Sequence, residues 1–503
     1  MPIPLFNTVV SWMLKKRKYQ IDMFIENPVE VQNEVLYSLL NEARFTEIGK
    51  KYHFRRIKDY HSFSKNVPIR KYESIEPIIE RARKGEENIF WPTKIKWFAK
   101  SSGTTNAKSK FIPVSDEALE DCHMKGGKDM LCLYINNNEE TEMFTGKALG
   151  LGGSHSVHEE SKTYYGDLSA ILIDNMPFWA DITSAMSQKT ALMSEWEAKM
   201  DAIIKETVDE NITSLAGVPS WMLVLLNRIL EKTGKKNILE VWPNLEVFFH
   251  GGVNFNPYIE QYKRLIPSDK FKYYETYNAS EGFFAIQDQN NSKDLLLMLD
   301  YGIFYEFIPM DQYQEEDSVA IPLQDVELGK NYAIVITTNS GLWRYLIGDT
   351  VKFTSLNPFR IRITGRTKHF INVFGEELIV ENAEDALKKA CEKTESEISE
   401  YTVAPVFMDG KKNGAHEWII EFSSPPEDLK EFTKILDETL KNINSDYEAK
   451  RYNDMTLSMP KLHQAKQGLF YEWLKKKNKL GGQHKVPRMS NSRDFLEELL
   501  LMN

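Results

Sequence analysis

The stretch LEVFFHGGVNFNPYIEQYKRL (residues 245–265) decides the fold, because it passes from an apolar run through a Gly-Gly loop into a helical pattern. The next stretch, FKYYETYNASEGFFAIQ (residues 271–287), joins an apolar run, a polar loop and a second apolar run. Such alternation indicates an α/β sheet, in which ligands gather beyond the carboxyl ends of the strands. We therefore expect an α/β protein with its functional side chains in the loops after its strands.

The flanking regions differ in character from this middle part. The first 90 or so residues have helical spacing of apolar positions, whereas residues 295–310 and 331–353 are rich in β-branched and aromatic residues. After Pro358 the pattern changes to a short strand, a Gly-Arg turn, a hairpin and a helix. We predict a large multi-sheet N-terminal domain over 1–365 and a smaller, mobile α+β domain over 366–503, with a hinge near 365–368.

Bulk composition excludes several classes of protein. A formal charge of −10 argues against a nucleic-acid binder that works by neutralising phosphates. Three cysteines, none in a C-x-x-C pair, favour a reducing, cytoplasmic compartment and argue against a zinc site. In the opening segment (residues 1–20) the positive charges follow the apolar run, the reverse of a signal peptide, and it is interpreted as an amphipathic surface helix. No apolar run approaches the ~20 residues of a membrane span, so stable membrane insertion is not expected.

The stretch SSGTTNAKSKF (residues 101–111) has the composition of an anion-binding loop. Its hydroxyls and backbone N–H groups can donate to phosphate oxygens, and Lys108 and Lys110 add charge. It lacks the spacing of the common phosphate loop, and a polar surface turn would have the same composition. We expect a strand at residues 94–100 before it and a helix capped by Ser115 after it, a position that favours anions.

Two further loops carry groups suited to a nucleotide. In the first, Tyr277 could stack on a base, Ser280 could reach a phosphate and Glu281 could hold Mg²⁺, although a solvated carboxylate is the alternative. In the second, Asp349 follows Gly348 in an expected turn and could accept both ribose hydroxyls, or could merely close the turn. Arg366 lies 17 residues further on.

In this order the motifs resemble the acyl-adenylate-forming superfamily, and most closely its auxin-responsive acyl acid–amido synthetase branch. The patterns S-S-G-T-[ST], T-Y-x-[AS]-S-E, G-L-[YW]-R-Y-x-x-G-D and Q-x-K-x-P-R are matched at residues 101–105, 276–281, 341–349 and 483–488. Asn106-Ala107 and Ser109 depart from the branch, and residues 365–384 follow the wider superfamily better. The resemblance spans nearly the whole chain.

The resemblance implies an enzyme that uses ATP and Mg²⁺ to convert a small carboxylic acid into acyl-AMP, and then transfers the acyl group to an amino acid amine. It implies phosphate contacts from the first loop and Ser280, Mg²⁺ on Glu281, adenine between the Gly-Gly loop and Tyr277, ribose on Asp349 with Arg366, and α-phosphate neutralisation by Lys485. The full set implied to bind nucleotide is Ser101, Ser102, Gly103, Thr104, Thr105, Lys110, Gly251, Gly252, Thr276, Tyr277, Ser280, Asp349 and Arg366, with Lys485, Ser101, Thr105 and Glu281 also implied to be catalytic.

Two alternatives remain open at this point. An acyl-CoA ligase would use the same adenylate, and a nucleotide-binding sensor would have lost catalysis. The apolar stretches at residues 167–179 and 218–229 could line an acyl pocket or belong to the core. The sequence HSVHEE (residues 155–160) lacks zinc-protease spacing and is interpreted as a solvated loop.

Overall fold

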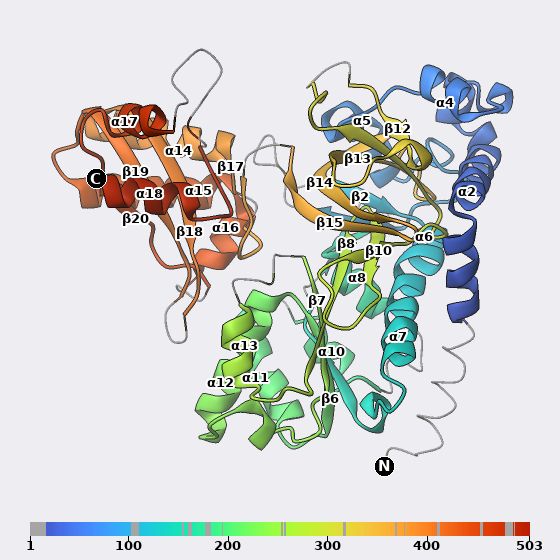
Figure 1. Cartoon of the computed structure of the whole chain (residues 1–503), viewed down its shortest axis with the longest axis horizontal. Helices are drawn as coiled ribbons and strands as arrows, with labels where there is room; N and C mark the ends of the chain where they lie inside the picture. Colours follow the sequence, from blue (N-terminus) through green and yellow to red (C-terminus); the bar gives the residue numbers. More distant parts are fainter. Residues whose placement is uncertain are drawn as a thin grey trace.

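The computed structural model describes residues 17–101, 110–152, 155–158, 163–176, 183–193, 195–252, 255, 258–314, 318–367, 370–376, 378–409, 413–452, 456–477, 486 and 488–503. An 11-stranded sheet in the order β12-β11-β13-β14-β15-β10-β9-β8-β7-β6-β3 organises the larger part of the molecule. A separate four-stranded sheet has the order β2-β1-β5-β4, in which β5 is Thr163–Gly166 and β4 is His155–His158. A three-stranded sheet (β18-β19-β20) belongs to the C-terminal region (Figure 1). The predicted mixed α/β class with several sheets is confirmed.

The N-terminal region is helical, as its apolar spacing predicts. A helix over residues 17–26 is followed by α2 (Pro28–Glu42), α3 (Glu47–Lys51), α4 (Tyr60–Asn66) and α5 (Tyr72–Arg83). The Gln32 side chain fastens α2 to the sheet, since its amide donates to the carbonyls of Leu299 and Ile303 and its oxygen accepts from Tyr305 N. These bonds hold the helices on one face of the antiparallel half of the sheet.

One half of the large sheet is parallel. Its strands are β3 (Lys147–Gly150), β6 (Ile212–Gly217), β7 (Val247–Gly251) and β8 (Lys272–Ala279), in parallel register with one another. The helices α10 (Gln188–Ala191), α11 (Trp196–Thr207), α12 (Pro219–Thr233) and α13 (Ile259–Leu265) belong to this half. The helix α8 (Leu168–Asp174) instead contacts β1 and β5 of the four-stranded sheet. Because β6, β7 and β8 run in one direction, their carboxyl ends form a common edge, which is where ligands bind in such sheets.

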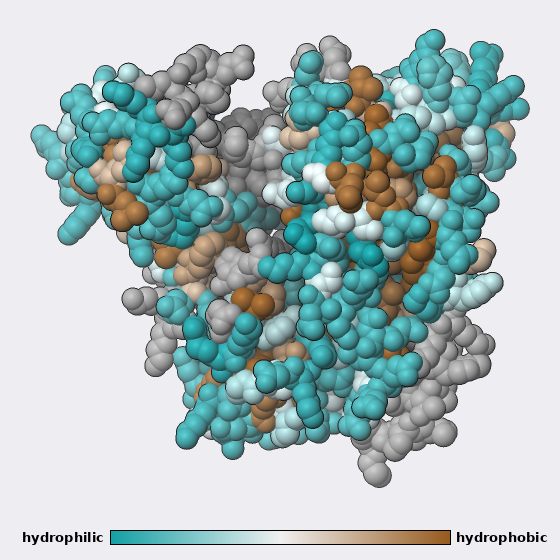
Figure 2. Space-filling model, viewed as in Figure 1, coloured by the Kyte–Doolittle hydropathy of each residue, from teal (hydrophilic) through white to brown (hydrophobic). Residues whose placement is uncertain are grey.

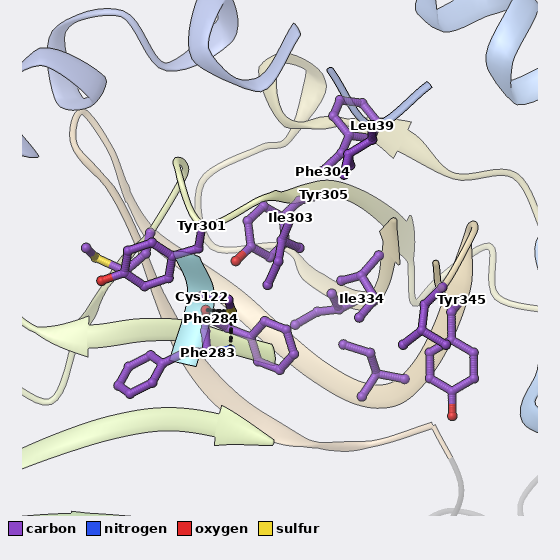
Figure 3. Packing of buried hydrophobic residues seen from close by; sticks show 14 of the residues in the cluster. Leu39, Cys122, Phe283, Phe284, Tyr301, Ile303, Phe304, Tyr305, Ile334 and Tyr345 are labelled. Carbon is purple, nitrogen blue, oxygen red and sulfur yellow. Dashed lines mark hydrogen bonds between the residues drawn. The ribbon is translucent and has the colours of Figure 1, made fainter. Parts of the chain in front are cut away.

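The other half of the sheet is antiparallel and contains the principal core. Its strands are β9 (Gly282–Gln287), β10 (Leu295–Leu297), β11 (Ile303–Pro309), β12 (Ile321–Pro322), β13 (Asn331–Thr338), β14 (Tyr345–Leu356) and β15 (Phe359–Arg366). Figure 3 shows Phe283, Phe284, Ile303, Tyr305 and Ile334 packed together, with Tyr345 at the margin of this cluster and its hydroxyl turned away. The expected Gly-Arg turn is wrong, because Gly365 and Arg366 complete β15.

A long helix covers β9. It comprises α6 (Asp116–Ala118), a π-helical segment (Leu119–Met124) and α7 (Lys125–Asn137). Phe283 N donates to Cys122 Sγ at 3.2 Å (Figure 3). A Cβ at Gly126 would lie 2.5 Å from the Phe283 ring. Only glycine permits this close approach, which fixes the helix against the strand beside Glu281.

The C-terminal region combines helices with a three-stranded sheet of its own, and its core joins that of the parallel half. It contains the hairpin β16 (Phe370–Ile371) and β17 (Leu378–Ile379), the strands β18 (Glu397–Val406), β19 (Ala415–Ser424) and β20 (Lys461–Gln464), and the helices α14 (Val380–Thr394), α15 (Leu429–Ile443), α16 (Ser445–Arg451), α17 (Leu469–Lys476) and α18 (Asp494–Met502). It contacts the parallel half through Tyr258, whose hydroxyl donates to Val373 O, and through Gln261, whose amide donates to Met408 O. Both contacts come from the neighbourhood of α13.

Polar and charged residues cover most of the face visible in Figure 2, in keeping with the formal charge of −10. Among the described residues, no helix combines the length and apolar character needed to cross a membrane.

Candidate active site

The Gly-Gly loop and the start of the T-Y-x-A-S-E motif meet at the carboxyl edge of the parallel strands. Gly251 lies opposite Thr276 in the β7–β8 register, and Thr276 Oγ1 donates to His250 O at 3.3 Å. A Cβ on Gly251 would come within 2.5 Å of Thr276 O, and Gly252 has a φ of +82°, so both positions require glycine. The structure therefore brings Gly251, Gly252 and Thr276 together.

Tyr277 links this edge to the second predicted motif. Its hydroxyl donates to Asp349 Oδ2 at 2.7 Å, across 72 residues of chain. The strands β8 and β14 lie four places apart in the sheet order, which in a flat sheet would separate them by roughly 19 Å. The hydrogen bond therefore requires the sheet to curl, so that both motifs face one space.

The surroundings of Tyr277 and Asp349 modify two expectations. The Tyr277 residue is 5% exposed and its ring lies 4.9 Å from the ring of Phe284, so it is a core ring that presents its hydroxyl to the site. Asp349 does not occupy a turn, because it lies within β14 beside Gly348, whose φ is +96°. The register between β14 and β15 shifts directly after Thr350, and such irregularities redirect side chains at functional edges.

The β15 strand supplies the backbone opposite Asp349. Arg366 is its register partner, and Thr367 N donates to Gly348 O at 2.8 Å. The Arg366 side chain lies outside what the structure describes. The pairing nevertheless brings the predicted Asp349 and Arg366 positions to the same point, immediately before the C-terminal region begins.

Ser280 and Glu281 form the two-residue connection of the β8–β9 hairpin. The Tyr345 hydroxyl donates to Glu281 Oε1 at a long 3.5 Å, so this turn and β14 share a second contact. The sequence alone did not single out Tyr345, although it lies within the match at residues 341–349. Among the described residues, no group of three or more His, Cys, Asp or Glu side chains is arranged to hold a metal ion. A cation here would have to share Glu281 with substrate oxygens and water.

The first motif connects β1 (Trp97–Ser101) to β2 (Lys110–Val114), which pair antiparallel with Ser101 opposite Lys110. The expected strand-to-helix placement is therefore wrong, because β2 intervenes. The predicted cap is confirmed, since Ser115 Oγ accepts from Ala118 N at 2.9 Å. The Ser115 side chain thus satisfies one N–H group at the N-terminus of the helix, and β2 separates this terminus from the loop.

Several predicted residues lie partly or wholly outside the described residues. Lys110 is described, with its Nζ 5.5 Å from the centroid of the Tyr72 ring. Ser101 is described through its backbone alone. The predicted residues that fall outside the described residues are Ser102, Gly103, Thr104, Thr105 and Lys485.

His250, directly before the Gly-Gly loop, is a buried residue that belongs to none of the motifs in the sequence. Burial lowers the pKa of His250 to about 3, so the ring is neutral, and it stacks on Phe255 with 4.0 Å between centroids. The sequence FFHGG offers a signal, because a histidine between two phenylalanines and a tight loop has an apolar environment. The neutral ring supports the loop without adding charge to the site.

Three domain models of one protein family match this chain. The GH3 family N-terminal domain matches residues 17–271, the GH3 family central domain residues 296–366 and the GH3 family C-terminal domain residues 381–494. Two relatives from Arabidopsis thaliana are each 22% identical over 95% of this chain: an indole-3-acetic acid-amido synthetase, GH3.3 (92% of its length), and a 4-substituted benzoates-glutamate ligase, GH3.12 (96% of its length).

Solved structures show the same fold. The GH3.15 acyl acid amido synthetase superposes with a TM-score of 0.62 at 18% identity, covering 97% of this chain and 96% of that one. A 2-hydroxyisobutyryl-CoA ligase complex superposes with a TM-score of 0.54 at 12% identity, covering 95% and 92%. Since the family N-terminal domain alone matches more than half of the chain and the other two domains follow in order, this protein belongs to the GH3 family.

Proposed function

We propose that this protein is an ATP-dependent acyl acid–amido synthetase, which forms an acyl-AMP from a small carboxylic acid and then an amide with an amino acid. The family membership supports this function, and so do the named activities of the relatives GH3.3 and GH3.12. The observation that carries it is the Tyr277–Asp349 hydrogen bond, which joins two separated nucleotide motifs at one sheet edge.

The two contacts between the β8–β9 hairpin and β14 suggest how a nucleotide would lie. Glu281 contacts Tyr345 and Tyr277 contacts Asp349, and these two β14 residues lie at an irregularity in which Leu346 to Thr350 lie opposite only Val335 to Ala333 of β13. A nucleotide bound beside these contacts would have its phosphates toward Glu281 and its ribose toward Asp349. In this proposal Tyr277 orients Asp349, and the base lies over Gly251, Gly252 and Thr276.

Mg²⁺ fits Glu281 as a shared ligand. The carboxylate is a hard oxygen donor in a short turn, and Mg²⁺ commonly takes one carboxylate together with substrate phosphates and water. When bound, the ion would neutralise charge on the leaving pyrophosphate. Ser280 and the hydroxyls of the loop that follows Ser101 would contact the same phosphates.

The C-terminal region would supply the mobile part of the enzyme, with the division near residues 365–368 and Lys485 as the group that neutralises the α-phosphate. The end of β15 at Arg366 and the separate C-terminal sheet support the division. Lys485→Ala should reduce acyl-AMP formation far more than amide formation from supplied acyl-AMP, with the exposed Lys476→Ala as the control. Equal loss in both half-reactions would remove this role from Lys485.

Acid-dependent ATP–pyrophosphate exchange over a library of carboxylic acids, followed by mass analysis of products, tests the function. Exchange followed by amides with amino acids supports the synthetase. Exchange followed by thioesters with CoA, and no amides, would make the protein an acyl-CoA ligase.

The three free cysteines, of which Cys122 and Cys132 are buried, support the proposed cytoplasmic location.

A further inference from the structure

Lys450, in α16, is a buried cation that packs on an aromatic ring. The residue is 7% exposed, and its Nζ lies 3.8 Å from the centroid of the Trp221 ring across the contact between the C-terminal region and α12. Its neighbour Arg451 shows the alternative, because it forms two 2.7 Å hydrogen bonds to the buried carboxylate of Asp437. Among the described residues, the partner of the Lys450 ammonium is a ring and not a carboxylate. Burial of such a group is costly unless an anion joins it.

The Trp221 ring stands at the ligand edge of the parallel strands. The helix α12 begins at Pro219, two residues after β6 ends at Gly217, and Trp221 is in its first turn. A Cβ on Gly252 would lie 3.5 Å from Val218 Cγ2, so the start of α12 adjoins the Gly-Gly loop. The C-terminal region, with α16 on its inner side (Figure 1), thus delivers an ammonium group close to the loop assigned to the nucleotide.

Three carboxylates, those of Asp446, Glu376 and Asp167, act on the Lys450 ammonium from a distance. Asp167, at the start of α8, acts on both Lys450 and Lys199, and Lys199 Nζ donates to Gly152 O. Burial lowers the pKa of each of these lysines to about 8, so both are charged at neutral pH. Glu376 is already bonded to His416 Nε2 at 2.9 Å and to Phe374 N at 2.7 Å. Asp446 belongs to the first turn of α16 itself.

We propose that Lys450 binds the α-carboxylate of the acceptor amino acid, an assignment that rests on the amido synthetase function proposed above. An ammonium held over a ring at this edge can form a charge-assisted hydrogen bond to a carboxylate. In the step that it serves, the amine nitrogen forms a bond to the acyl carbon, the bond from that carbon to the AMP oxygen breaks, and AMP leaves with the electron pair. The acceptor nitrogen, now bonded to the acyl carbon, releases its surplus proton to solvent. Lys450 makes and breaks no covalent bond; it determines which amines are held for attack.

The variant Lys450→Met tests this assignment, because methionine keeps an unbranched chain against Trp221 and removes the charge. Three quantities are measured: acid-dependent ATP–pyrophosphate exchange, KM for the amino acid found in the amide product, and KM for its α-carboxamide. For a glutamate product these acceptors are L-glutamate and isoglutamine. Lys434→Met, at an exposed position of α15, is the matched control.

We expect unchanged exchange, a KM for the amino acid raised at least tenfold, and an unchanged KM for the carboxamide. An equal change for both acceptors, or none for either, overturns the assignment. Loss of exchange would place Lys450 at the nucleotide and overturn it as well. If the unaltered enzyme shows exchange but forms no amide, the proposed function itself fails and takes this assignment with it.

Discussion

The stretch Gly341–Asp349 contains two charged residues that serve different purposes. Arg344 donates to both oxygens of the Glu306 carboxylate at 2.7–3.1 Å and to the carbonyls of Ser64 and Val67, all inside the protein. Asp349, five residues on, is half-buried within β14 and accepts from Tyr277. One motif therefore contains a residue whose partners are all structural and one that faces the site.

This contrast shows that a match to a family pattern does not separate architecture from chemistry. The Arg344–Glu306 pair joins the match at residues 341–349 to the β11 strand, and Tyr60 OH adds a hydrogen bond to the same carboxylate at 2.9 Å. Burial and the identity of the partners make the distinction. The following substitutions test it from the largest expected effect to the smallest.

Arg344→Met should produce the largest loss of stability. It leaves the Glu306 carboxylate, which is 0% exposed, without its cation, and breaking a buried pair on one side costs about 3–5 kcal/mol. Denaturant unfolding measures the loss. The double variant Arg344→Met, Glu306→Gln should recover much of it, and the exchange activity per folded molecule should stay unchanged. A loss below about 1 kcal/mol would show that the pair is not the support described here.

Asp349→Asn should affect nucleotide binding and leave stability nearly unchanged. The substitution keeps the shape and removes the charge, and hydrogen bonds to a charged group contribute about 1.5–3 kcal/mol, so KM for ATP in the exchange reaction should rise about 10- to 100-fold. Asp269→Asn, at an exposed position, is the control. If KM stays constant while the unfolding free energy falls, Asp349 is structural like Arg344, and the contrast between the two residues disappears.

Tyr277→Phe should have a smaller effect on the same parameter. It removes one hydroxyl that orients Asp349, and a single hydrogen bond contributes about 0.5–1.5 kcal/mol, so KM for ATP should rise at most about tenfold. Because the two residues act through one bond, the effect should nearly vanish in the Asp349→Asn background. Additive effects would mean that Tyr277 contacts the nucleotide independently.

Periodicity and turn composition predicted the elements of this fold well, because those signals are local. Nearby residues predict the helices α2 and α5, the strands β7 and β8, the Gly-Gly loop at the end of β7 and the Ser115 cap. The β2 strand was missed because its five residues, KFIPV, contain a proline and follow the polar loop directly. Asp349 was placed in a turn because Gly348 looks like a turn signal, whereas the glycine serves an irregularity within β14.

The site depended on information that is not local. No spacing in the sequence reveals that β8 and β14, four places apart in the sheet, meet through Tyr277 and Asp349. Lys450 likewise resembles any other lysine of a charged helix until the contact with Trp221 is known. The family resemblance supplied candidate roles for the residues. Their arrangement in space depends on the curvature of the sheet and on the packing of α16 against α12.

Glu275 allows the smallest and most selective test, since it lies on β8 next to Thr276 but outside the matched motif. Burial raises the pKa of Glu275 to about 7, against the opposing influence of Lys293 and Arg362. Because the folded protein favours the protonated form, stability should be lost as pH rises from about 4.5 to about 7 and should then stay constant. Glu275→Gln removes this loss, so the variant should gain relative to the parent between pH 5 and pH 8. The gain should be below about 1 kcal/mol, less than the 1.4 kcal/mol per pKa unit of a fully buried group, because the side chain is partly exposed.

Urea unfolding at pH 5 and pH 8 measures this gain in stability, with the exposed Glu231→Gln as control. If stability rises and exchange activity stays unchanged, Glu275 has a structural role, like Arg344. If KM for ATP rises instead, Glu275 belongs to the nucleotide site together with Thr276.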